Sequence, residues 1–412
     1  MTKKSDAPAI RFKGFSDAWE QRKLTEFVES FSGLTYTPND VQENGTLVLR
    51  SSNVSNGEVV DADNVYVNPQ VVNSENVKVG DIVVVVRNGS RSLIGKHAQI
   101  KAFMPNTVIG AFMTGIRSEC PEFTNALLNT SRFEEEIAMN MGATINQITG
   151  YMFSKMEFKV PCLDEQKKIG EYFEKLDRLV TLHQRKFEKL TNVKKSMLEK
   201  MFPQNGSSYP EIRFKGFTDP WEQRKLGELV DRVVRKNTNN ESTLPLTISA
   251  QYGLVDQITY FNNRVASRDV SNYYLVLNGE FAYNKSTSDG YPFGAVKRLD
   301  LYEKGVLSTL YIVFAPKKEQ QIDSDYLTVF FDTDRWHKGV AERAAEGARN
   351  HGLLNISAED FFDIDLSVPK DIVEQKQIGA FIRQLDNLIT LHQRELKKLQ
   401  NIKKSMLEKM FV

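Results

Sequence analysis

Two blocks of sequence occur twice in this chain, and this internal repeat limits the possible folds more than any other feature. Residues 10–24 (IRFKGFSDAWEQRKL) match residues 212–226, and residues 165–202 match residues 374–411 at about two thirds of their positions. A period near 200 residues has the size of a domain. The chain of 412 residues is therefore expected to hold two similar domains rather than a solenoid.

The segments between the repeated blocks differ. Residues 25–160 and 227–369 share almost no run of identical residues. Each half is therefore a repeated frame around its own insert, which suggests one scaffold that presents two versions of the same kind of surface. The predicted segments are a first insert domain at 1–162, a long helix at 163–202, a linker with the second insert domain at 203–370 and a second long helix at 371–412.

The longer repeated block predicts a helix of the coiled-coil type. Apolar residues recur at alternating steps of three and four, and no proline interrupts either copy. Such a helix of 38 residues would be about 57 Å long. Its apolar stripe needs a partner, for which the other copy, running antiparallel, is the obvious choice. The predicted seam consists of Ile169, Phe173, Leu176, Val180, Phe187, Leu190, Ile378, Ile382, Leu385, Ile389, Leu396 and Leu399.

Two polar residue types interrupt this seam at matching positions. His183 and His392 are compatible with a pH-sensitive or metal-binding site, or with polar seam residues that fix the helix register. Lys194 and Lys403, each followed by a second lysine, are compatible with phosphate contacts or with a solvated face.

Both inserts have the pattern of mixed α and β structure. In the first insert, strands are expected at 47–50, 81–87 and 97–101, with a helix at 122–141. In the second insert, strands are expected at 279–283 and 310–314, with a helix at 323–346. The predicted fold class is α+β: two mixed domains separated by two long antiparallel helices that form an intramolecular coiled coil, with a pseudo-two-fold internal repeat.

Polar loops at corresponding places in the two inserts carry side chains suited to DNA. Arg, Asn and Gln read base edges in the major groove, while Ser, Thr and Lys hold phosphates. Each residue alone is also compatible with an ordinary polar loop. The candidate DNA-binding residues are Arg87, Asn88, Ser90, Arg91, Lys96, Thr144, Asn146, Gln147, Lys285, Ser286, Ser288, Tyr291, Arg349 and Asn350.

Composition excludes several classes of protein. The formal net charge is only +1, which argues against a polybasic nucleic-acid binder, although each long helix segment carries +3 and residues 35–162 and 203–370 each carry −3. The two cysteines, Cys120 and Cys162, are too few for a disulfide scaffold or a cysteine-based zinc site. No apolar run is long enough to span a bilayer, and no secretory signal opens the chain. We therefore expect a cytoplasmic protein with no membrane partner.

No catalytic motif stands out in the sequence. It contains no phosphate-binding loop, dinucleotide-binding glycine motif, nucleophile elbow or zinc-binding His-Glu-x-x-His helix. Nuclease-like Glu-x-Lys triplets begin at Glu157, Glu165 and Glu374, and we interpret them as accidental. Neither a metal site nor a bound cofactor is expected in this chain.

The repeated motifs resemble those of the specificity subunits of type I restriction-modification systems. The resemblance rests on E-Q-K-x-I-G at the start of each long helix, on L-H-Q-R and K-K-S-M-L-E-K-M-F within it, and on the two W-E-Q-R-K-L segments. It extends over essentially the whole chain, and the inserts are its least diagnostic part.

The resemblance implies a non-catalytic subunit that recognises double-stranded DNA. Each insert would be a target recognition domain for one half of a split sequence, and the helices would set the gap between the halves. Two methyltransferase subunits and two restriction subunits, which act as motor and nuclease, would be its partners. S-adenosylmethionine, ATP and magnesium would belong to those partners.

Two other classes of function are compatible with parts of the sequence. One is a coiled-coil scaffold whose inserts bind protein. The other is a stand-alone DNA enzyme, which the lack of a catalytic motif disfavours.

Overall fold

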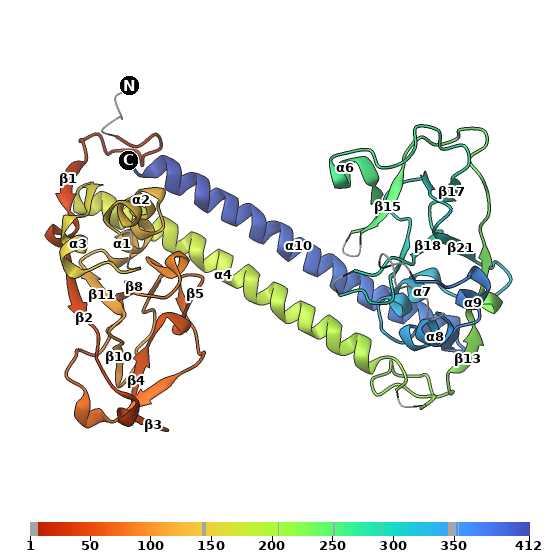
Figure 1. Ribbon diagram of the computed structural model, residues 1–412, viewed down its shortest axis with the longest axis horizontal. Coiled ribbons are helices and arrows are strands. Elements are labelled where there is room, and N and C mark those ends of the chain that lie inside the picture. Colours follow the sequence, from red (N-terminus) through yellow and green to blue (C-terminus); the bar gives the residue numbers. More distant parts are fainter. Residues whose placement is uncertain are drawn as a thin grey trace. The chain divides into compact units, whose positions relative to one another are not determined.

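The structure is a computed structural model that describes residues 7–141, 146–204, 206–249, 252–288, 290–344, 352 and 354–412. The chain divides into two compact units. Unit 1 comprises residues 1–185 and 393–412, and unit 2 comprises residues 186–392. Each unit contains part of both long helices, α4 (Leu163–Lys200) and α10 (Ile372–Met410) (Figure 1).

Unit 1 is built around two four-stranded sheets. The first is antiparallel, in the order β2 (Val28–Ser32), β11 (Met113–Ser118), β8 (Ile82–Val85) and β9 (His97–Gln99). The second has the order β10 (Thr107–Ile109), β4 (Thr46–Leu49), β7 (Val65–Val67) and β3 (Val41–Gln42). The remaining elements of the insert are the strand pair β5 (Val54–Ser55) and β6 (Glu58–Val59) and the helices α1 (Pro121–Leu128), α2 (Ser131–Asn140) and α3 (Gly150–Lys155).

Unit 2 repeats the first of these sheets. Its antiparallel order is β14 (Val230–Arg232), β21 (Ile312–Pro316), β18 (Phe281–Asn284) and β19 (Ala295–Arg298). Two further strand pairs are β15 (Leu246–Ser249) with β16 (Gly253–Asp256), and β17 (Tyr274–Leu277) with β20 (Lys304–Leu307). The helices are α5 (Leu226–Leu229), α6 (Gln257–Phe261), α7 (Ser324–Phe331), α8 (His337–Arg343) and α9 (Ala358–Phe362).

The mixed sheets and the two long helices confirm the predicted α+β class. The five predicted strands correspond to β4, β8, β9, β18 and β21, each within two residues of its expected bounds. The long helices also form where the repeated blocks predict them. No helix in the described part of the chain is both long and apolar enough to cross a membrane.

The single helix predicted in each insert is wrong, because the structure has two helices there. Segment 122–141 breaks between α1 and α2, and segment 323–346 breaks between α7 and α8. A threonine lies at each break: the Thr130 and Thr333 hydroxyls donate to the carbonyls of Leu127 and Phe330, both at 2.6 Å. Such bonds from a side chain to the backbone compete with the hydrogen bonds that would continue the helix. The spacing of apolar residues, on which the prediction is based, contains no information about them.

The repeated tryptophan segment makes the same strand pair in both units. β1 (Glu20–Lys23) pairs antiparallel with β12 (Glu157–Val160). β13 (Glu222–Lys225) pairs with β22 (Asp365–Val368) in the equivalent register. Each insert ends in a Val-Pro pair, Val160-Pro161 or Val368-Pro369, and the pairing of Val160 with Glu20 and of Val368 with Glu222 holds this end beside the start of the frame.

A buried ion pair joins the N-terminal segment of each frame to a long helix. Arg11 donates to both carboxylate oxygens of Glu165, at 2.7 and 2.8 Å, and Arg213 makes the same bonds to Glu374. Both carboxylates are buried, so each depends on its guanidinium partner. The Glu-x-Lys triplets at the helix starts therefore have a structural role.

The glycine of E-Q-K-x-I-G lets the start of each long helix approach the insert. A Cβ atom at Gly170 would lie 2.8 Å from the backbone nitrogen of Phe123 in α1. A Cβ atom at Gly379 would lie 2.7 Å from the Cβ atom of Asp325 in α7. Any larger residue would force these helices apart.

The end of each long helix closes the frame of the other copy. In unit 1, Phe411 stacks on Phe123 at 5.6 Å and contacts Trp19, and Ile10 donates its backbone N–H to the Lys409 carbonyl at 2.9 Å. In unit 2, Phe202 takes the equivalent place beside Trp221 and Tyr326, and Ile212 donates to the Lys200 carbonyl at 3.0 Å. Figure 1 shows the C-terminal end of α10 beside the start of α4 in unit 1.

Helices α4 and α10 run antiparallel, as unit 1 demonstrates. Phe173 of α4 contacts Phe411, while Asp177, further along α4, pairs with the earlier Lys403 of α10. Seven predicted seam residues are buried and the other five are partly buried. The buried ones are Ile169, Phe173, Leu176, Ile378, Ile382, Leu385 and Leu396, and the partly buried ones are Val180, Phe187, Leu190, Ile389 and Leu399.

The seam lysines form matching ion pairs between the two helices. In unit 1, the Lys403 ammonium lies 2.6 Å from Asp177. In unit 2, Lys194 lies 2.7 Å from Asp386 and 3.1 Å from Asp332, which follows α7 in the insert. These contacts give the lysines a structural role in place of the phosphate contact or solvated face considered from the sequence.

Only unit 2 extends this ion pair into the described part of its insert. Asp332 also accepts from Lys297 at 2.8 Å. Burial raises the pKa of Asp332, but Lys297 and Lys194 outweigh it and hold that pKa below its ordinary value. In unit 1, the residue at the position of Asp332 is the neutral Asn129, which donates to His97 at 3.1 Å.

We predict that Lys194→Met destabilises unit 2 by about 2 kcal/mol, because it leaves Asp386 without its ion-pair partner and Asp332 with Lys297 alone. The matched variant Lys403→Met leaves one carboxylate of unit 1 without its partner and should cost about 1 kcal/mol. Amide hydrogen exchange, evaluated separately for each unit, measures both losses. Equal losses would contradict the account of an ion cluster that extends into the insert of unit 2 alone.

Candidate nucleic-acid interface

Two of the predicted DNA-binding segments lie together in unit 1. The loop after β8 is bonded to the segment that precedes α3: Ile148 donates to the Val86 carbonyl at 2.8 Å, and Asn88 donates to the Asn146 carbonyl at 3.3 Å. Arg87 and Gln147 also form an isolated antiparallel bridge. The structure thus brings residues 87–91 and 146–147 into one polar surface.

The same pairing of loops occurs in unit 2. Leu354 donates to the Lys285 carbonyl at 3.0 Å, and Thr287 donates to the Gly352 carbonyl at 2.6 Å. Ser288 and Tyr291 close the tip of the loop through two backbone hydrogen bonds, of 3.2 and 2.8 Å. We call each pair of bonded segments a composite loop. It consists of residues 87–91 with 146–147 in unit 1, after β8, and of residues 285–288 and 290–291 with 352 and 354 in unit 2, after β18.

The candidate side chains differ in how free they are to bind a ligand. Six are exposed: Arg87, Ser90, Arg91, Ser286, Ser288 and Tyr291. Five are partly buried: Asn88, Lys96, Asn146, Gln147 and Lys285. Thr144, Arg349 and Asn350 lie outside the described residues.

Several of the partly buried side chains hold the loops in place. Asn146 donates to the Gly89 carbonyl at 3.0 Å, and Lys285 donates to the Ile356 carbonyl at 3.3 Å. The Asn88 amide donates to the Ser51 hydroxyl at 3.0 Å. These residues are suited to positioning the loop, while the exposed ones are suited to contacting DNA.

The loop surface of unit 1 also includes residues that the sequence analysis missed. The Arg87 guanidinium lies over the ring of Phe112, 4.9 Å from its centre. Phe112 and Ser51 both line a cavity of about 530 Å³. No sequence pattern marks these contacts, because the residues are far apart along the chain and meet only in the folded unit.

The histidine beside this surface is a buried, uncharged residue. Burial lowers the pKa of His97. Its Nδ1–H donates to the Gly95 carbonyl at 3.0 Å, and its Nε2 accepts from Asn129. His97 therefore supports the packing of β9 rather than contacting a ligand.

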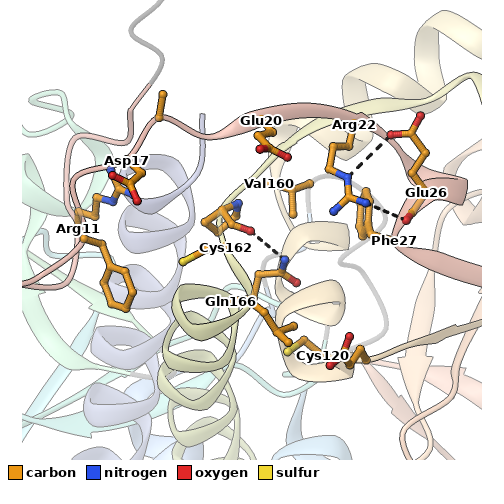
Figure 2. Close-up of a pocket in the computed structure, with 15 residues that line it drawn as sticks. Arg11, Asp17, Glu20, Arg22, Glu26, Phe27, Cys120, Val160, Cys162 and Gln166 are labelled. Atoms are coloured by element: carbon orange, nitrogen blue, oxygen red, sulfur yellow. Dashed lines mark hydrogen bonds and ion pairs between the residues drawn. The ribbon is translucent and has the colours of Figure 1, made fainter.

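Figure 2 shows a second cavity of unit 1, of about 380 Å³, beneath the N-terminal segment at the start of α4. Its walls include both cysteines, which are free thiols, and burial raises the pKa of Cys120. Gln166 donates to the Pro161 carbonyl at 2.9 Å, and Arg22 donates to the Glu26 carbonyl at 3.1 Å. None of its lining residues belongs to the composite loop, so this cavity is a separate feature of unit 1.

The chain therefore belongs to a class of proteins with a duplicated frame. Each copy of the frame carries a different insert, and the two inserts have composite loops at equivalent places. Residues 16–192 and 218–401 match the family described as the type I restriction modification DNA specificity domain. The match includes most of the chain, and the chain belongs to this family.

Curated relatives are similar over part of their length. The type I restriction enzyme StySPI specificity subunit of Salmonella potsdam is 25% identical over 226 residues, which are 52% of this chain and 48% of the relative. The MjaVIII specificity subunit of Methanocaldococcus jannaschii is 26% identical over 279 residues, 65% of this chain and 64% of the relative. The chain thus spans between about half and two thirds of these relatives.

One solved structure has the same fold over nearly its whole length. The crystal structure of the type I restriction-modification system S subunit from M. genitalium aligns with a TM-score of 0.65. The alignment covers 98% of this chain and 99% of that one, at 13% sequence identity. At this identity the likeness concerns the fold alone.

Proposed function

We propose that this chain is the sequence-specific DNA-recognition subunit of a type I restriction-modification complex. The observation that carries the proposal is the equivalent composite loop of both inserts, built on like frames from unlike residues. Because the two loops differ in their residues while their frames are similar, they are suited to a DNA target whose two parts differ in sequence. Unit 1 reads one part and unit 2 reads the other, while the paired helices set the gap between them.

The exposed loop residues have the chemistry for both kinds of DNA contact. Arg87 and Arg91 are exposed in unit 1, and arginine recognises guanine by two hydrogen bonds in the major groove. Ser286 and Ser288 are exposed in unit 2, where hydroxyl groups donate to phosphates or base edges. The two units therefore differ in the residues that read bases.

The weak net charge supports a division of tasks within a complex. Affinity for the DNA backbone comes mainly from cations that neutralise phosphates, and this chain has a net charge of only +1. The chain supplies sequence readout and geometry, while its partners supply much of the nonspecific affinity. It is itself non-catalytic and acts in the cytoplasm. Two methyltransferase subunits use S-adenosylmethionine, and two restriction subunits use ATP and magnesium.

A pair of exposed leucines on each long helix is suited to docking the methyltransferase subunits. Leu179 and Leu182 of α4 are 43% and 56% exposed, and Leu388 and Leu391 of α10 are 44% and 51% exposed. Residues three apart share one helix face. Because the repeat places an equal apolar patch in each unit, we assign one methyltransferase subunit to each patch.

Exchange of residues 25–160 for the first insert of another family member tests the recognition role. We expect the preferred DNA to change in one of its two parts, as read by sequencing the DNA selected from a random pool. Arg87→Ala should cost about 1–3 kcal/mol of discrimination in that same part. Arg22→Ala, on the frame strand β1, is the control. Loss of preference in both parts would contradict independent inserts.

Loss of one leucine patch should reduce the number of methyltransferase subunits that bind. Burial of a leucine is worth about 1.5–3 kcal/mol, so Leu179→Glu with Leu182→Glu should weaken one docking site at least about 100-fold. Native mass spectrometry of the complex should then find one methyltransferase subunit in place of two. Leu310→Glu, which changes an exposed leucine outside the long helices, is the control. Two bound subunits in the double variant would exclude this patch as the docking site.

A further inference from the structure

Two lining residues of the cavity of about 530 Å³ in unit 1 contact the composite loop. Arg87 lies over the ring of Phe112 at one wall, and Asn88 donates to Ser51 at another. Phe112 and Ser51 both line the cavity. A DNA segment that contacts the loop would therefore lie close to this cavity.

One wall of the cavity presents an aromatic surface. The Phe112 side chain is 54% exposed, although the neighbouring Met113 is buried. Tyr36 and the buried Leu34 also line the cavity. Nucleobases stack on exposed aromatic rings regardless of their sequence, because every base has a π-face.

The polar side of the cavity holds a fixed arginine. Nη2 of Arg50 donates to both the backbone carbonyl and the carboxylate of Asp63, each at 2.6 Å. Asp63 has a φ of +50°, a left-handed conformation that aspartate tolerates better than most residues. The Arg50 side chain remains 33% exposed, and its bonds to Asp63 hold it at a fixed position. Ser51 and Ser52 add hydroxyl groups to the same lining.

We propose that this cavity binds one nucleobase of the target DNA after the base leaves the helical stack. The base stacks on Phe112, and Arg50 donates to its acceptor edge, for which guanine, with acceptors at O6 and N7, is the best match. This inference rests on the DNA-recognition function proposed above and adds a base-binding site to it.

The concave shape of the site favours a displaced base over a base read within the duplex. Base edges in an intact groove are read by side chains that project into the groove. A cavity instead receives a group that projects from the DNA, as in proteins that bind an everted base between aromatic and polar side chains. Asp63, by clamping Arg50, acts as a positioning residue for this contact.

The test uses the chain assembled with its methyltransferase subunits and DNA duplexes in which 2-aminopurine stands next to each position of the first part of the target in turn. The fluorescence of the probe rises when the neighbouring base leaves the stack. We expect a several-fold rise next to one position besides the adenine that the methyltransferase modifies. Phe112→Ala and Arg50→Met should abolish that second signal, and Phe112→Ala should weaken binding about tenfold through lost stacking.

Two variants control for indirect effects. Ala111→Trp fills the cavity and keeps both proposed contact residues, so it should also abolish the second signal. Phe103→Ala, which removes another exposed phenylalanine of unit 1, should leave the signal unchanged. Sequence-specific binding with no second bright position would overturn the base-binding cavity and leave the recognition function intact. Absence of sequence-specific binding would overturn the recognition function itself.

Discussion

In each unit of this protein, the start of one long helix and the end of the other pack against the same repeated segment, and the rest of the structure depends on this contact. In unit 1, the start of α4 is tied to the N-terminal segment by Arg11 and Glu165, while the end of α10 places Phe411 against Trp19. Unit 2 uses Arg213 with Glu374, and Phe202 with Trp221, in the same way. Neither insert has a complete core without both long helices, so the antiparallel helix pair is a condition of folding as well as a connection.

This arrangement leaves the inserts free to differ. They differ in whether the described part of the insert joins the Lys–Asp pair that the helices present. Unit 2 meets that pair with Asp332 and Lys297, and unit 1 has the neutral Asn129 at the position of Asp332. The frame therefore accepts either a charged or a neutral residue at this position of the insert.

The repeat made much of the fold predictable from the sequence, because paired copies distinguish the frame from the inserts without knowledge of any structure. The seam of α4 and α10 was readable from its apolar spacing, and the strands β8 and β18 from their composition. The breaks at Thr130 and Thr333 were not, since they depend on single hydroxyl groups. In the candidate interface, the loops were predictable as polar segments, but their pairing and the cavity of Arg50 and Phe112 depend on contacts between distant residues.

If the two units read two different parts of one split DNA sequence, as we propose, methylation directed by this chain should show both parts. The most direct measurement is sequencing of methylated bases across the genome of a host that lacks other methylation and expresses this chain with its methyltransferase subunit. We expect one motif made of two short defined parts, unlike each other and separated by a gap of fixed length and free sequence. A single continuous motif, or methylation without sequence preference, would contradict this proposal.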